Sequence, residues 1–115
     1  MNDQTPLSQH HPDRLHARIV ELGEAWADAD AAAALLEETK KVVAARLFLN
    51  AAGKSVAERE AMALASDDYR QHIASMVEAR RVAQRAKVKY DGSKTWVDMV
   101  RSLESTERTR MQLGG

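Results

Sequence analysis

A heptad repeat of apolar side chains is the feature that most restricts what this chain can fold into. From Leu15 to Leu47, residues recur at alternating intervals of four and three, and all are apolar except Lys40. This spacing places them on one face of an α-helix and is typical of helices that pack against another helix. It predicts a core and oligomer seam, here called the first seam, that comprises Leu15, Ile19, Leu22, Trp26, Leu36, Val43 and Leu47, with Ala29, Ala33 and Lys40 in the same series.

Lys40 has two interpretations at its place in the first seam. A buried lysine there would select the register or the oligomeric state at a cost in stability. Alternatively, its aliphatic stem would pack while the amine reaches the edge of the seam. The sequence does not decide between the two.

Residues that start and stop helices divide the chain into three expected helices. The first is expected over residues 13–51, with Gly53 as a left-handed cap after its end. Ser55 and Glu58 match the S-x-x-E capping box, so a short helix is expected over 55–65. Before these helices, residues 1–12 are polar, contain both prolines and are expected to form a flexible tail.

A second long apolar pattern predicts a third helix over residues 68–112. Its face runs from Ile73 to Val100, and we expect Leu103 and Met111 to extend it. Asp91-Gly92 is a turn signal in a loop, but the apolar period continues through it, which favours an unbroken helix. The alternative is a break at this point, with Ser93 capping a last helix. Residues 113–115 are expected to fray.

These elements predict an all-α fold with a single helical domain over residues 13–112. We expect an antiparallel hairpin of two long helices with a short helix at the corner, coiled-coil-like and oligomeric. Aromatic residues make up only 4% of the chain, so the core is thin and a second copy would bury more surface. A dimer is favoured because a second apolar stripe widens the face of the first helix: Val20, Ala25, Ala32, Leu35, Thr39, Val42 and Leu49.

The formal net charge of zero hides a marked asymmetry along the chain. Residues 1–38 hold eight acids and two bases, whereas residues 78–115 hold nine bases and five acids. We expect the acidic first helix to pair with the basic third helix, as charges do at coiled-coil flanks. The alternative hypothesis assigns these bases a function. They would form a phosphate-binding strip that comprises Arg80, Arg81, Arg85, Lys87, Lys89 and Lys94.

Aromatic side chains lie near this basic strip. Tyr90 and Trp96 could stack on nucleic-acid bases, although packing in the seam explains them better. His72 lies near Asp67 and Asp68, where we expect an ion pair or a cap.

Several classes of chemistry find no support in the sequence. The chain has no cysteine, no glycine-rich phosphate loop and no nucleophile–base motif. His10, His11, Asp13 and His16 are better explained by a solvated tail than by a metal site. We therefore expect no enzyme activity, no cofactor, no metal and no small-molecule substrate.

The expected location is the cytoplasm. No apolar run approaches the roughly 18 residues that span a bilayer, so no membrane partner is expected. The first residues lack the basic-then-apolar pattern of a secretory signal.

Two segments carry a family resemblance, namely Gly53–Glu60 with Tyr69 downstream, and Trp96 followed by Arg101–Arg108. Over roughly residues 40–112, the chain resembles small helical proteins of tailed phages and prophages. The resemblance implies a phage origin, the cytoplasm of the host cell, and a gene region for recombination or single-strand DNA handling. It implies no catalytic residue.

Three functions therefore compete. The first is a non-enzymatic, phage-encoded accessory protein that binds DNA or a DNA-handling protein through the basic helix. The second is an interaction or inhibitor module that acts on a host defence complex through the acidic helix. The third is a purely structural helical oligomer. The sequence leaves the partner and the order of the oligomer open.

Overall fold

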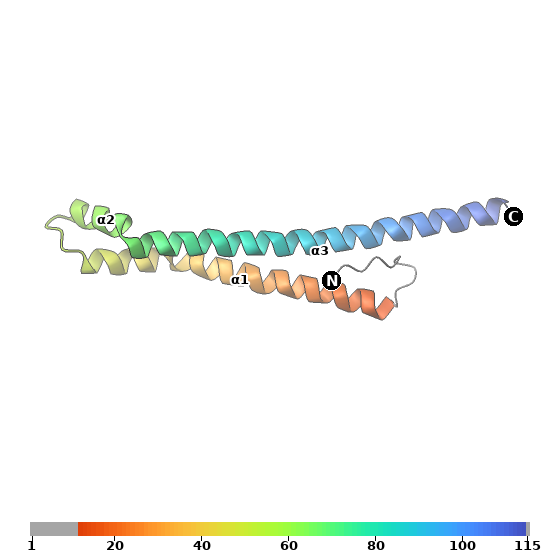
Figure 1. Cartoon of the computed structure of the whole chain (residues 1–115), viewed down its shortest axis with the longest axis horizontal. Helices are drawn as coiled ribbons and strands as arrows, with labels where there is room; N and C mark the ends of the chain where they lie inside the picture. Colours follow the sequence, from red (N-terminus) through yellow and green to blue (C-terminus); the bar gives the residue numbers. More distant parts are fainter. Residues whose placement is uncertain (1–11, 115) are drawn as a thin grey trace. The chain divides into compact units, whose positions relative to one another are not determined.

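The computed structural model describes residues 12–114, and its three α-helices confirm the all-α fold (Figure 1). They are α1 (Pro12–Asn50), α2 (Val56–Ala65) and α3 (Asp67–Gly114). The helices start and end within two residues of the predicted limits. The tail expected over residues 1–12 lies outside the described residues except for Pro12, which begins α1. At the other end, α3 continues through Leu113 and Gly114, beyond the predicted end at residue 112.

The capping box predicted at the start of α2 is present in a modified form. The hydroxyl of Ser55 accepts a hydrogen bond from the Glu58 backbone N–H at 3.1 Å. The Glu58 carboxylate accepts one from the backbone N–H of Lys54 at 2.8 Å, instead of from the Ser55 N–H. Two backbone donors that the helix cannot pair internally are thereby satisfied.

Gly53 plays a different role from the predicted left-handed cap. No glycine between residues 12 and 114 has a positive φ. A Cβ at Gly53 would lie 2.9 Å from the Glu58 Cβ and 3.0 Å from the Arg59 nitrogen. The Nε of Arg59 donates a hydrogen bond to the Gly53 carbonyl at 2.9 Å. Gly53 is therefore required because the loop packs closely against the start of α2.

Ser66 ends α2 and begins α3. Its hydroxyl donates to the Ala63 carbonyl at 2.8 Å and accepts from the Tyr69 backbone N–H at 3.2 Å. Asp67 and Asp68 occupy the first turn of α3, where negative charge is stabilised by the helix dipole. Further along, α3 passes through Asp91-Gly92 without a break, as the apolar period predicted.

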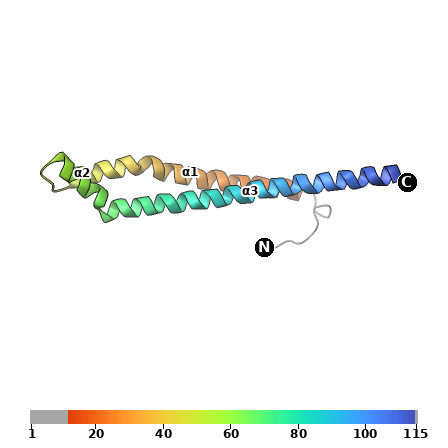
Figure 2. The same cartoon turned by 90° about the horizontal axis from the view of Figure 1, so that it is seen from above.

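Figure 2 shows the three helices from a second direction. The chain divides into two structural units, and α1 and α3 contribute to both. The central unit is Trp26–Arg85 and contains all of α2. The terminal unit consists of residues 1–25 and 86–115, of which 12–25 and 86–114 are described. No described helix has the length and apolar character needed to cross a bilayer.

The residues of the first seam are half-buried or buried, with one exception. Lys40 is exposed, which matches the interpretation in which its amine reaches solvent. The corresponding face of α3, from Ile73 to Val100, is likewise half-buried or buried. The buried side chains of the described helices are small: Ala33 and Ala83 in the two long helices, Ala63 in α2, and Val97.

One prediction about the apolar faces is wrong. Leu103 and Met111 do not extend the buried face of α3, because both are exposed. The second stripe of α1 lies outside the buried face of the single chain. Of its members only Thr39 is half-buried, and the others are exposed. A large share of the apolar surface of α1 thus faces solvent.

Candidate interaction surfaces

Arg80 connects α3 to α1 within the central unit. Its Nη1 lies 2.6 Å from the Asp30 Oδ1, and its Nη2 and Nε donate to the two Glu37 carboxylate oxygens at 2.7 and 3.0 Å. The Arg80 side chain is 32% exposed. A guanidinium that meets a carboxylate with two parallel hydrogen bonds is the strongest geometry for such a pair.

The charges of this cluster change the ionisation of its members. The hydrogen bond from Arg80 lowers the pKa of Glu37 below its ordinary value, and the nearby positive charge contributes further. The hydrogen bonds from Glu37 and Asp30 raise the pKa of Arg80. Both shifts favour the charged forms of Glu37 and Arg80. For Arg80, the structure matches the expected pairing between the acidic and basic helices, and its guanidinium is already engaged.

The other two arginines of the strip in the central unit face solvent. Arg81 pairs with Glu78 on its own helix, with Nη2 3.0 Å from Oε1. This hydrogen bond lowers the pKa of Glu78, to which the charges of Arg81 and Arg85 also contribute. Arg81 and Arg85 are both exposed. Neither is tied to α1 by a described ion pair. Arg81 is engaged by Glu78 on its own helix, whereas no ion pair described within residues 12–114 engages Arg85.

The lysines of the strip belong to the terminal unit, and all three are exposed. Lys94 lies 3.7 Å from Asp91 and 4.2 Å from the centre of the Tyr90 ring. A cation at this distance from an aromatic face is attracted to its negative centre. Lys94 thus has local partners on its own helix.

The two aromatic residues near the strip differ in burial. Tyr90 is half-buried, and a Cβ at Gly23 of α1 would lie only 3.1 Å from its Cε1. Its ring therefore packs over the glycine in the terminal unit, as a seam residue would. Trp96 is 41% exposed, so part of its ring remains accessible.

His72 does not interact as predicted. Its Nε2 lies 2.8 Å from the Leu36 carbonyl of α1, rather than near Asp67 or Asp68. The carbonyl has no proton, so the imidazole is the donor. The same carbonyl also accepts from the Thr39 hydroxyl at 3.1 Å. The His72 side chain thus connects α3 to α1 by a hydrogen bond within the central unit.

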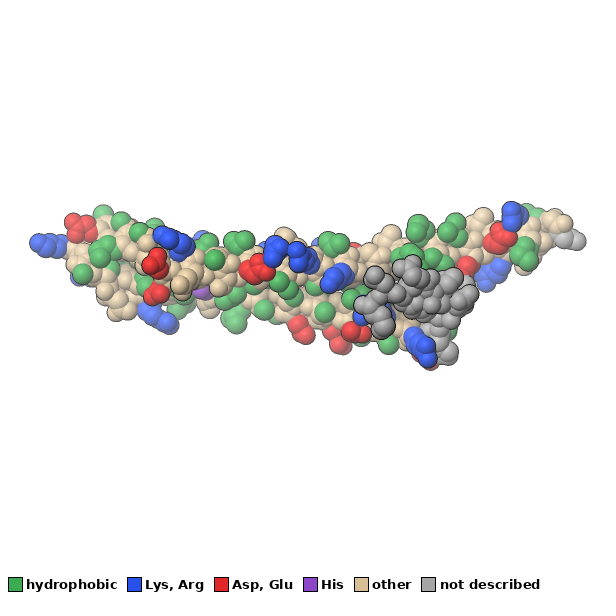
Figure 3. All heavy atoms as spheres, viewed as in Figure 1, with side chains coloured by type: hydrophobic (Ala, Val, Ile, Leu, Met, Phe, Trp, Pro, Cys, Tyr) green, Lys and Arg blue, Asp and Glu red, His purple; other side chains and the backbone are tan. Residues whose placement is uncertain are grey.

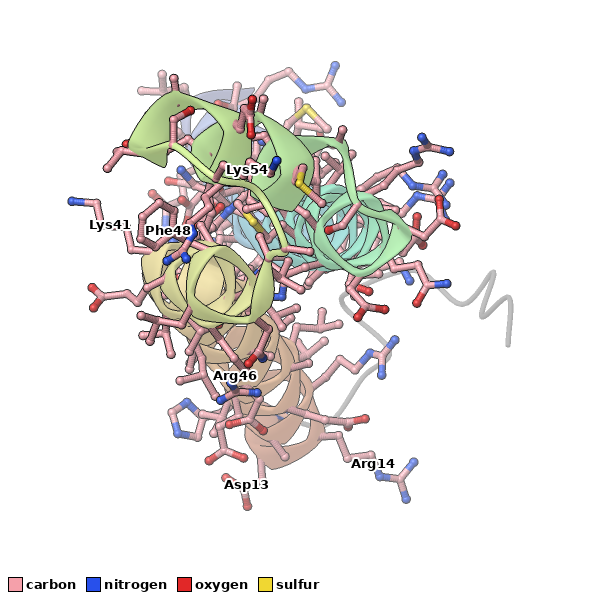
Figure 4. All side chains as sticks on the ribbon, turned by 90° about the vertical axis from the view of Figure 1, so that its left-hand side faces the viewer. Asp13, Arg14, Lys41, Arg46, Phe48 and Lys54 are labelled. Atoms are coloured by element: carbon pink, nitrogen blue, oxygen red, sulfur yellow. The ribbon has the colours of Figure 1, made fainter. Side chains whose placement is uncertain are left out.

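A shallow apolar groove lies between α1 and α2. Its volume is about 360 Å³, and it is lined by Ala44, Ala45, Phe48, Glu60, Ala63 and Leu64. Figure 4 shows Phe48 on the side of α1 toward α2, with Arg46 on the opposite side. The groove is open and nearly without polar groups, so it offers a contact surface rather than a chemically selective site.

Exposed hydrophobic side chains are numerous along the described helices (Figure 3). On α1 they include Leu35, Val42 and Leu49, which are 64%, 54% and 74% exposed and lie seven residues apart. The sequence contained this signal, because the three residues belong to the second stripe. Periodicity alone does not tell which of the two stripes faces α3.

The candidate metal ligands are only partly described. His10 and His11 lie outside the described residues, and His16 is exposed on α1. Among residues 12–114 no group of three or more histidines and carboxylates is placed to hold a metal ion.

Comparisons with protein-family models, curated proteins and solved structures gave no match to this chain. The resemblance to phage proteins therefore stays a prediction.

Proposed function

We propose that this protein is a non-enzymatic, self-associating helical module whose two long helices form an antiparallel hairpin. The contacts inside each unit support the hairpin. In the central unit, Leu36 contacts His72, while the earlier Asp30 contacts the later Arg80. In the terminal unit, Gly23 lies against Tyr90. Within the central unit, earlier residues of α1 meet later residues of α3, as antiparallel helices do.

The observation that carries self-association is the imbalance between buried and exposed apolar side chains. Only Ala33, Ala63, Ala83 and Val97 are buried among the described residues, and none is larger than valine. Fifteen large hydrophobic residues of the same helices are exposed. Because burial contributes about 25 cal/mol per Å² of apolar surface, covering part of this surface with another copy stabilises the chain. A chain with only two long helices leaves much of each helix uncovered, so burial of apolar surface in an assembly stabilises it.

Sedimentation velocity over a concentration range tests this function. We expect the full chain to form dimers as its concentration rises from about 5 to about 300 µM, because association depends on mass action. Circular dichroism and thermal melting over the same range should show a melting temperature that rises with concentration. A monomer throughout the range, with a constant melting temperature, contradicts the proposal.

A second candidate function is supported by the exposed bases of α3. Arg81, Arg85 and Lys89 are exposed and follow each other at intervals of four residues on one helix. Such a row can follow the phosphates of a nucleic-acid strand. In this role the protein would be an accessory to DNA handling in the host cytoplasm, as the resemblance to phage proteins implies. The opposite candidate, an acidic surface that mimics nucleic acid, is weakened because Asp30 and Glu37 are paired with Arg80.

Salt-titrated binding of a fluorescent single-stranded oligonucleotide tests this second function. If each side chain contacts a phosphate, replacing Arg81, Arg85 and Lys89 with glutamine should flatten the salt slope by about two units. The matched control replaces Arg101, Arg108 and Arg110, which carry the same charge on the same helix. No binding at about 50 mM salt, where electrostatic association is favoured, would exclude this function.

A further inference from the structure

The exposed hydrophobic residues of α1 belong to a second heptad series, here called the outer stripe. It consists of Ala31, Leu35, Glu38, Val42, Ala45 and Leu49, which follow each other at intervals of four and three residues. All six are exposed, and all lie in the central unit. Each comes two residues after a member of the first seam, which is a rotation of about 200° at 3.6 residues per turn. The outer stripe therefore faces away from α3.

Apart from Glu38, the outer stripe alternates large and small side chains in a way that is complementary to itself. Leu35, Val42 and Leu49 occupy one heptad position, and Ala31, Glu38 and Ala45 occupy the other. In an antiparallel helix pair, residues of one position face residues of the other position on the partner. The two leucines then meet alanines, which lets the helices approach closely at these positions.

We propose that the outer stripe binds the outer stripe of a second copy of this chain in antiparallel orientation. In the matching register, the numbers of two residues that face each other add up to 80. Leu35 then faces Ala45 of the partner subunit, Leu49 faces Ala31 of the partner subunit, and Val42 faces Glu38 of the partner subunit. The inference rests on the proposed self-association and names the surface and orientation that produce it.

Charge complementarity selects the antiparallel orientation. A parallel pair in register would place Glu38 directly against Glu38 of the partner subunit, and like charges in contact oppose association. In the antiparallel register, Glu38 lies beside Lys41 of the partner subunit, and the two-fold axis repeats this contact. Both side chains are exposed, and no ion pair within residues 12–114 engages either of them, so both are available.

Cysteine cross-linking tests the register, because the chain contains no cysteine of its own. The variants Leu35→Cys and Ala45→Cys are mixed, allowed to exchange subunits and oxidised mildly. We expect a disulfide between positions 35 and 45, identified by mass spectrometry of proteolytic fragments. In the proposed dimer the two copies of residue 35 are offset by ten residues, about 15 Å at the rise of an α-helix. A disulfide requires Cα atoms within about 7 Å, so Leu35→Cys alone should cross-link poorly.

The cross-linking pattern separates this inference from the proposed function. A dimer whose principal disulfide joins residue 35 to residue 35 overturns the antiparallel orientation and leaves self-association intact. A dimer in which neither pair forms overturns the assignment of the interface to the outer stripe. A monomeric protein overturns both proposals together.

Charge reversal gives a second, independent test. Glu38→Lys places lysine beside Lys41 of the partner subunit and should raise the dimer dissociation constant about tenfold or more. Adding Lys41→Glu to the same chain restores opposite charges and should recover the original dissociation constant. If the double variant associates no better than Glu38→Lys, the proposed contact is wrong.

Val42→Asp should dissociate the dimer while circular dichroism shows unchanged helicity, because the residue is exposed within one chain. Val77→Asp is the matched control, since Val77 is a similarly exposed valine on α3. It should leave the dissociation constant within about twofold, as substitutions outside the contact surface usually do. If Val77→Asp disrupts the dimer and Val42→Asp does not, α3 carries the interface and the proposal fails.

Discussion

The central and terminal units join α1 to α3 by different means. In the central unit, directional polar contacts connect the helices, through Arg80 with Asp30 and Glu37 and through His72 with the Leu36 carbonyl. In the terminal unit, one contact between the helices depends on shape, because the Tyr90 ring lies over Gly23. Polar contacts specify one register because a shift leaves charges unpaired, whereas an aromatic ring over a glycine specifies it by the space available.

This difference predicts different sensitivities in the two units. The central unit should respond to pH and to the loss of a single charged partner. The terminal unit should respond to side-chain size at the glycine. The following substitutions test the comparison.

The largest effect is expected at the most buried residue of the central unit. Ala33→Asp places a carboxylate where the native side chain has no exposure, and an unpaired buried charge costs about 3–5 kcal/mol. Urea denaturation followed by circular dichroism measures the loss. Ala32→Asp is the control, because Ala32 is exposed and the change there should cost less than about 1 kcal/mol. Equal losses for the two variants would mean that Ala33 is not in a core.

A smaller effect is expected when Arg80 is replaced by glutamine. The variant loses its bonds to Asp30 and Glu37 and should melt at a lower temperature than the wild type. Arg81→Gln is the matched control, because Arg81 pairs with Glu78 on its own helix, and it should melt close to the wild type. Similar melting temperatures for the two variants would show that Arg80 contributes no more than a pair on one helix.

The same pair of variants predicts a pH dependence. Arg80 lowers the pKa of Glu37 in the folded chain below the ordinary 4.5. The corresponding stability is fully present above the unfolded pKa and is lost as the pH falls through the lower folded pKa. The advantage of wild type over Arg80→Gln should therefore be constant from about pH 7 to 5.5 and shrink from about pH 5 to 3. Thermal melts across this range measure it, and an advantage that grows in acid would contradict the assignment.

The smallest effects are expected at two helical glycines of the terminal unit. Gly92→Ala adds a Cβ with no atom within 4 Å, so it should stabilise α3 by about 0.5–1 kcal/mol through reduced backbone entropy. Gly23→Ala has the same intrinsic gain, but its Cβ meets Tyr90 at 3.1 Å, so its net gain should be smaller. Denaturant titration of the two variants measures the difference. A larger gain at Gly23 would show that the Tyr90 ring does not fix the register.

The sequence predicted the helices and the inward face of α1 because both depend on short-range periodicity. The first seam runs from Leu15 to Leu47, and its members are half-buried or buried except Lys40. The start of α2 was predictable for the same reason, since Ser55 and Glu58 lie within one turn of each other. Such patterns express the geometry of one helix and need no information about its neighbours.

The features that the sequence did not predict depend on which helix lies where. The partners of Arg80 lie 43 and 50 residues away along the sequence. The partner of His72, the Leu36 carbonyl, lies 36 residues away. No local rule selects these contacts from the other available carboxylates and carbonyls. Leu35, Val42 and Leu49 of the outer stripe were recognised as part of the second stripe, but their exposure follows from the position of α3 on the opposite face of α1.

The corner between α1 and α2 has a consequence for the order in which the chain folds. Its hydrogen bonds join residues only three to six positions apart, from Gly53 to Arg59. Contacts this local require little loop-closure entropy, so they form faster than contacts between distant residues. A corner that forms early shortens the effective loop between residues 36 and 72. The native contacts between the two long helices then form faster.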